Sequence, residues 1–143
     1  MRIFINILLY ICILFSFSIK SEDIPYLLTA SSKGDLESVK AIIESGGNPN
    51  TEDGDNVTAL MYASRKNQVE VARYLISKGA EVNKQETDGW TALMYASKNN
   101  YIDLVKVLID NDADLKITDS DGWTAYGLAA TSGNYQTLDL LIK

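Results

Sequence analysis

Apolar and polar residues follow one another in an order that recurs along most of the chain. In residues 91–109, TALMYASKNNYIDLVKVLI, the apolar residues Leu93 and Ala96 are followed by the polar pair Asn99 and Asn100. Apolar residues then return at three- and four-residue spacing, which is typical of one face of an α-helix. Because asparagine favours tight turns, the pattern predicts two short helices joined by a turn at the asparagine pair.

The ends of these helices also carry signals. Thr91 stands where its hydroxyl can cap the first helix, and Gly46 and Gly79 follow the second helix in two other segments. In the segment just described, Asp112 occupies that position, preceded by Asn111. Since aspartate adopts a left-handed backbone less easily than glycine, we expect a looser helix end there.

The pattern occurs three times at an interval of 33 residues without gaps: DNVTALMYASRKNQVEVARYLI at 55–76, DGWTALMYASKNNYIDLVKVLI at 88–109 and DGWTAYGLAATSGNYQTLDLLI at 121–142. A fourth, more degenerate copy opens at about Ile24. Self-similarity at this period is typical of a solenoid, in which each unit buries its apolar faces against its neighbours. The predicted repeats cover about 24–53, 54–86, 87–119 and 120–143.

The repeat also assigns the larger side chains. Tyr126 falls in the frame of Leu60 and Leu93 and is therefore predicted to point inward. Tyr62 and Tyr95 are predicted to join the packing between repeats, with hydroxyls that need a hydrogen-bond partner.

With these residues in place, the sequence resembles the ankyrin-repeat family from about Ile24 to Lys143. The family motif continues from its threonine with proline, leucine and histidine; here the threonine is kept, alanine replaces proline, and methionine or glycine replaces histidine. The threonines are Thr58, Thr91 and Thr124, the alanines Ala59, Ala92 and Ala125, and the last group Met61, Met94 and Gly127. The resemblance implies an all-α solenoid of stacked helix-turn-helix units joined by β-hairpin-like loops.

The first residues differ from the rest. Residues 1–21 contain Arg2, an apolar run to about residue 17, and small residues at export-peptidase spacing, so they are predicted to be a signal peptide cleaved after Ser18 or Ser21. The alternative is an uncleaved N-terminal anchor, since the apolar run is close to membrane-spanning length. Residues 22–143 form the predicted repeat domain.

The amino-acid composition limits the kinds of functional site that the chain could carry. The chain has 143 residues, a net charge of −6, no histidine and a single cysteine, Cys12, which lies in the predicted signal peptide. Histidine triads, thiol nucleophiles and most zinc sites are thereby excluded, and an acidic chain is a poor match for nucleic acid. Asp53, Asp55, Asp119 and Asp121 resemble the opening of a calcium loop, but the later ligands are missing, so turn formation is the preferred interpretation. No enzyme activity, cofactor or metal is predicted.

The resemblance also implies a binding surface. In ankyrin repeats the hairpin tips and first helices line a concave face, to which the opening copy would add Ser32 and Lys33. Tryptophan is a frequent interface anchor, and opposite charges can steer a partner. Alternatively, the tryptophans simply pack along the hairpins and the charges solvate the surface. The candidate protein-binding residues are Trp90, Trp123, Arg65, Lys66, Lys98, Asn99, Asp88 and Asp121.

We therefore expect an exported, non-catalytic protein, periplasmic or secreted, that binds a protein partner through this concave surface. We expect a monomer that contacts neither nucleic acid nor, after cleavage, a membrane. The alternatives are a structural or protective envelope protein without one defined partner, and an effector acting on a host protein.

Overall fold

The computed structural model describes residues 26–142. The predicted signal peptide, its two cleavage positions and Cys12 lie outside this range. Within it the chain forms eight helices and no strand. A helix over 26–33 is followed by α2 (Leu36–Glu44), α3 (Ala59–Arg65), α4 (Val69–Ser77), α5 (Ala92–Lys98), α6 (Ile102–Asp110), α7 (Ala125–Thr131) and α8 (Tyr135–Leu141).

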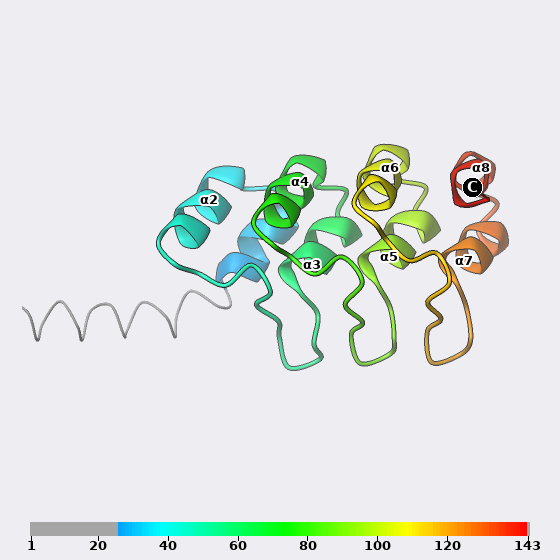
Figure 1. The fold of residues 1–143 in the computed structure, drawn as a ribbon, viewed down its shortest axis with the longest axis horizontal. Helices are drawn as coiled ribbons and strands as arrows, with labels where there is room; N and C mark the ends of the chain where they lie inside the picture. The colour runs from blue at the N-terminus through cyan, green and yellow to red at the C-terminus, as the bar shows by residue number, and fades with distance from the viewer. Residues whose placement is uncertain (1–25, 143) are drawn as a thin grey trace, which may run out of the picture.

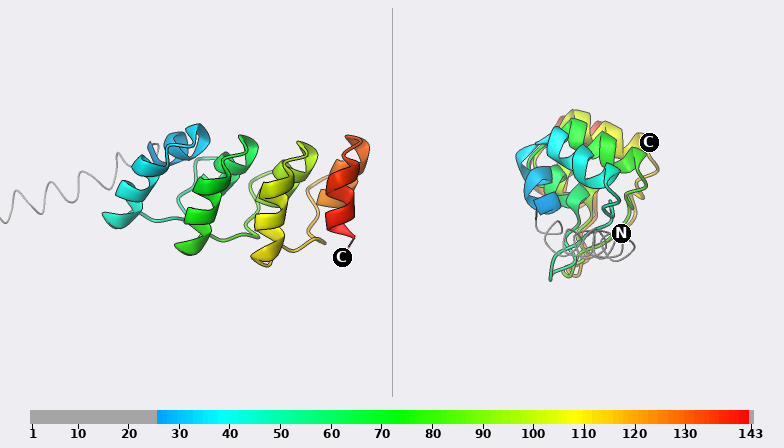
Figure 2. Two further views of the ribbon diagram at one scale, coloured as in Figure 1. Left: turned by 90° about the horizontal axis from the view of Figure 1, so that it is seen from above. Right: turned by 90° about the vertical axis from the view of Figure 1, so that its left-hand side faces the viewer.

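The helices form two rows along an elongated stack (Figure 1). One row holds the first helix of each pair, including α3, α5 and α7, and the other holds the second helices α2, α4, α6 and α8. In the first row α5 packs against α3 and α7, and in the second α6 packs against α4 and α8. Long loops project side by side beyond the first row, as the end-on view in Figure 2 also shows. The predicted all-α solenoid is confirmed.

Small and branched apolar residues at equivalent positions fill the space between the rows. Ala63, Ala96 and Ala129 are completely buried, which lets neighbouring helices approach closely. Leu60 and Leu93 are each only 1% exposed. Each repeat thus completes the core of the next, as the solenoid arrangement requires.

Tyr126 is an exception, and the prediction that it points inward is wrong. It is 44% exposed, although Leu60 and Leu93 in the same frame are buried. In the first row, α7 contacts α5 on one side, and no helix of the described residues lies on its other side. A side chain in this frame is therefore buried only where the first helix of a further repeat packs against it.

The helix starts and turns follow the sequence. The hydroxyls of Thr58, Thr91 and Thr124 each accept a hydrogen bond from the amide three residues later, at 3.2–3.3 Å, which confirms the cap predicted at Thr91 and shows the same cap at its two equivalents. Met61, which replaces the family's histidine, accepts a bond from the Thr58 amide through its sulfur at 3.4 Å. Asn100 has a φ of 57°, the left-handed conformation of a tight turn.

The helix end at Asp112 is as well bonded as the one at Gly79, so the expectation of a looser end is wrong. Asp112 has a φ of 63°, and its amide and the next one donate to carbonyls three and five residues earlier at 3.1 and 3.0 Å. The corresponding bonds at Gly79 measure 3.0 Å each. In addition, the Asn111 side chain donates to the Val107 carbonyl at 2.8 Å. This extra bond belongs to the Asp112 junction and helps to hold the helix end.

None of the helices in residues 26–142 is long and apolar enough to cross a membrane.

Candidate functional site

Each β-hairpin-like loop is shaped by one acidic side chain. Asp53, Glu86 and Asp119 stand 33 residues apart, and the carboxylate of each accepts bonds from the amides two and four residues later, at 2.8–3.1 Å. These carboxylates are therefore turn-forming groups, as the sequence predicted for Asp53 and Asp119. Within residues 26–142, no group of three or more acidic, histidine or cysteine side chains could hold a metal ion.

Neighbouring hairpins are also joined to one another. The Thr87 amide donates to the Asp55 carbonyl at 3.0 Å, and the Ser120 amide donates to the Asp88 carbonyl at 2.9 Å. The Thr87 hydroxyl donates to the same Asp55 carbonyl at 2.7 Å. The hairpin tips therefore form a continuous ridge, and Asp88 is fixed within it.

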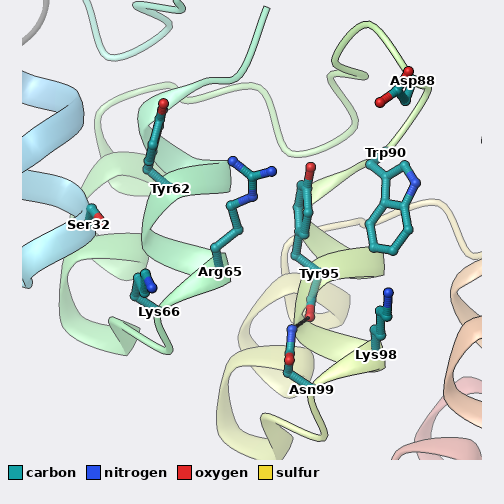
Figure 3. Close-up of a pocket in the computed structure, with 9 residues that line it drawn as sticks. All are labelled: Ser32, Tyr62, Arg65, Lys66, Asp88, Trp90, Tyr95, Lys98 and Asn99. Atoms are coloured by element: carbon teal, nitrogen blue, oxygen red, sulfur yellow. Dashed lines mark hydrogen bonds between the residues drawn. The ribbon is translucent and has the colours of Figure 1, made fainter. Parts of the chain in front are cut away.

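Between this ridge and the ends of the first helices lies an open hollow of about 600 Å³ (Figure 3). Its lining comes from two repeats and the edge of a third, and it combines aromatic rings with three cations and one carboxylate. We call it the aromatic–cationic hollow. Its residues are Ser32, Tyr62, Arg65, Lys66, Asp88, Trp90, Tyr95, Lys98 and Asn99.

Aromatic rings and cations alternate along the hollow. The rings of Trp90 and Tyr95 lie 4.9 Å apart between centroids, at an interplanar angle of 38°. The Arg65 guanidinium lies 4.6 Å from the Tyr95 ring centre and 5.9 Å from that of Tyr62, and Figure 3 shows its side chain between the two. The Lys98 ammonium lies 5.0 Å from the Trp90 ring centre. These cation–π contacts restrain the charged groups beside the rings.

The cations of the hollow differ from those on the second helices. Lys40, Arg73 and Lys106 each form an ion pair with an acidic residue three positions earlier on the same helix. The remaining ion pair among the described residues joins Lys84 to Glu52. Arg65, Lys66 and Lys98 therefore have no carboxylate within ion-pair distance in residues 26–142, and their charge is available to a partner.

Hydrogen bonding and burial fix the ionisation states beside the hollow. Burial raises the pKa of Tyr95, although the nearby Arg65 opposes this. The bond from the Tyr62 hydroxyl to Asp53, at 2.7 Å, raises the pKa of Tyr62. At Asp53, burial acts to raise the pKa, but the bonds from Tyr62 and from backbone amides outweigh it, so the pKa is lowered. Both phenols are thus neutral and Asp53 is ionised near neutral pH.

The structure brings six of the eight candidate residues together in this hollow. These are Arg65, Lys66, Asp88, Trp90, Lys98 and Asn99. Asp121 and Trp123 belong to the next hairpin and do not line it. Trp123 is 44% exposed, and its ring lies so close to Gly127 that a Cβ there would come within 2.9 Å of it. The Trp123 ring therefore lies against α7 and outside the hollow.

Two residues of the hollow were predicted only as packing residues. Tyr62 and Tyr95 do pack against the core, but each is only half-buried and also lines the hollow. Their spacing contained the signal: Tyr62 lies three residues before Arg65, and Tyr95 three before Lys98, so each tyrosine shares a helix face with a cation.

The sequence matches the family model described as ankyrin repeats (3 copies) over residues 27–119 and again over 79–143. No curated protein matches the chain. The two matches together span residues 27–143, well over half of the sequence. Ankyrin repeats are generally protein–protein interaction modules and typically non-catalytic. With the repeat period, the stacked helix pairs and the hairpin ridge, this match shows that the chain belongs to the ankyrin-repeat family.

Proposed function

We propose that this chain is an exported, non-catalytic binding module that docks a protein partner on its hairpin and first-helix surface, with the aromatic–cationic hollow at the centre. The observation that carries the proposal is the convergence of Trp90, Tyr95 and Arg65 in one open hollow. Tryptophan, tyrosine and arginine are the residue types that most often dominate binding energy at protein interfaces.

The hollow is suited to binding with little rearrangement. Trp90 packs against Tyr95, Arg65 is held beside Tyr95, and Asp88 is fixed in the hairpin ridge. A surface that is already ordered loses less conformational entropy on association. A folded partner would therefore dock on the ridge and the first helices together.

The proposal extends to location and assembly. The predicted signal peptide supports export to the periplasm or the exterior, and we propose a monomer. Intact-mass measurement of the protein recovered from cells distinguishes a chain cleaved after Ser18 or Ser21 from one that keeps residues 1–21 as an anchor.

In-cell crosslinking tests the binding surface. A photoreactive residue replaces Asn99 at the edge of the hollow, and in a control protein replaces Arg73 on the outer helix α4. We expect a saturable protein adduct from position 99 that is absent from position 73. Trp90→Ala should abolish the adduct, whereas Trp123→Ala should weaken it less because Trp123 lies outside the hollow.

Trp90→Ala also removes packing against Tyr95, so a second variant is needed. Lys98→Glu reverses an exposed charge of the hollow without emptying a packed position. Loss of the adduct in both variants, with unchanged circular dichroism for Lys98→Glu, supports the proposal. An adduct that survives both substitutions would contradict it.

A further inference from the structure

We infer that the aromatic–cationic hollow binds an acidic segment of a protein partner, with a carboxylate side chain held by the hollow's cations and a neighbouring apolar side chain against Trp90. This inference rests on the proposed function and names the chemistry of the partner at the same site.

The charge of the hollow is opposite to that of the molecule. Its lining contains three cations, Arg65, Lys66 and Lys98, and one carboxylate, Asp88, a net charge of +2 on a chain whose total is −6. At physiological ionic strength charges are screened beyond about 8 Å, so a docked segment responds mainly to this local charge. A basic segment would meet the unpaired cations at close range, and like charges in contact disfavour binding.

The cations are also concentrated where the hollow lies. Arg65 and Lys98 are equivalent positions of the two central repeats, and Lys66 follows Arg65. The same frame in the outer repeats carries neutral residues, apart from Lys33. Across the four repeats the two positions read Ser32, Arg65, Lys98 and Thr131, and Lys33, Lys66, Asn99 and Ser132. The positive charge thus marks the middle of the surface rather than its whole length.

Arg65 is placed to recognise a carboxylate. Its guanidinium rests beside the Tyr95 and Tyr62 rings, so less side-chain entropy is lost when it binds a partner. The planar group presents paired N–H donors that match the two oxygens of a carboxylate, and such bidentate bonds are among the strongest in proteins. Lys98, beside Trp90, supplies a second positive charge across the hollow.

The stacked rings define the second feature of the ligand. Trp90 and Tyr95 are both half-buried, so part of each ring faces the hollow. An apolar side chain next to the acidic one would remove this exposed aromatic surface from water. The expected segment therefore alternates acidic and apolar residues over a few positions.

Peptide display tests this chemistry. A library of random twelve-residue peptides is selected on the immobilised full-length chain, and the selected peptides are then titrated against the Trp123→Phe protein. The chain has two tryptophans, so this variant leaves Trp90 as the sole tryptophan reporter, inside the hollow. We expect aspartate and glutamate to be enriched, and binding to weaken about tenfold or more when a selected peptide's carboxylates are changed to amides.

A matched pair of triple variants tests whether peptide binding depends on the cations of the hollow. Arg65→Gln, Lys66→Gln and Lys98→Gln together should weaken the selected peptide about tenfold or more. Lys40→Gln, Arg73→Gln and Lys106→Gln together remove the same charge from the second helices and should leave its affinity within about twofold, because long-range terms are screened. Selection of peptides without acidic enrichment, selection of none, or equal weakening by both triple variants would overturn the inference.

The crosslinking experiment separates the two proposals. If the adduct at position 99 is lost in Trp90→Ala but kept in the Arg65, Lys66 and Lys98 triple variant, the partner binds the hollow without an acidic segment and only this inference is wrong. If the adduct is insensitive to both changes, the proposed function itself is wrong.

Discussion

At the scale of single residues, one carboxylate in each hairpin accepts hydrogen bonds from backbone amides, which the partner strand would do in a regular β-ladder. The hairpin around Asp53 has one isolated antiparallel bridge, between Glu52 and Thr58, and the Asp53 carboxylate accepts from two of its amides. Glu86 and Asp119 each accept from the two equivalent amides of their own hairpins. Bonds to a charged acceptor are stronger than neutral ones, so the acid at this position is a local stabiliser.

Replacing Asp119 by alanine should therefore destabilise the protein. Asp119 is only 8% exposed, and its carboxylate accepts from the amides of Asp121 and Trp123 at 3.0 and 2.8 Å. We expect the free energy of unfolding to fall by about 1–3 kcal/mol, measured by urea denaturation. Asp121→Ala, two residues away and exposed, serves as the control and should change it by less than about 0.5 kcal/mol. Equal effects of the two changes would contradict this role for Asp119.

Residue identity predicts some features better than others. The threonine caps and the Asn100 turn depend on neighbours within a few positions, and the sequence shows these directly. The backbone preference of Asp112 alone predicts a looser helix end, but the bond that the preceding Asn111 donates to Val107 depends on a second side chain. Tyr126 was misjudged because its frame predicts burial only when another first helix follows.

At the scale of elements, asparagine side chains join one repeat to the next. The Asn83 side chain donates to the Asp112 carbonyl at 3.0 Å and accepts from the Asp114 amide at 2.8 Å. Asn50 makes the equivalent pair of bonds to Gly79 and Glu81 one repeat earlier. These contacts hold each loop against the end of the next second helix.

Asn83→Ala should weaken the coupling between the second and third repeats. The loss of two bonds, both exposed to solvent, is expected to lower the free energy of unfolding by about 1–2 kcal/mol. Lys116 occupies the same frame in the third repeat and its side chain makes no such bond in the described part of the chain, so Lys116→Ala is the matched control. Thermal and urea unfolding measure both; a loss in the control as large as in Asn83→Ala would argue against the coupling.

The aromatic–cationic hollow depends on side-chain contacts that the repeat pattern alone does not predict. The repeat predicts that Arg65, Lys98 and Trp90 share one surface, and in the structure they line one hollow. That Trp90 packs against Tyr95, whereas the equivalent Trp123 lies beside Gly127, depends on the residues at the neighbouring helix positions. Two positions that look identical in the repeat therefore have different surroundings.

At the scale of the whole molecule, the stability of each repeat depends on the repeats packed on either side of it. In the second row α6 has α4 on one side and α8 on the other, while α8 contacts α6 but no helix of the described residues beyond it. In a one-dimensional array a unit with a single neighbour opens more readily than one with two.

Hydrogen exchange should reveal this gradient. We expect the amides of α8 to exchange at least about tenfold faster than those of α6, because tenfold corresponds to only about 1.4 kcal/mol in opening free energy. Mass spectrometry of exchanged peptides measures the rates. Uniform protection from α3 to α8 would show that the stack opens only as a whole, and would contradict the gradient.

The bonds that join the repeats also require a fixed sequence spacing between their partners. Asn83 and Gln85 reach acceptors 29 and 33 residues further along, and Thr87 reaches back 32. A single-residue deletion between such partners would pull donors away from their acceptors, whereas excising or duplicating one complete 33-residue module would keep the remaining repeats in the same register. The protein's span can therefore change in whole modules, and because the aromatic–cationic hollow takes residues from Tyr62 to Asn99, two adjacent modules would have to be copied together to give a second hollow.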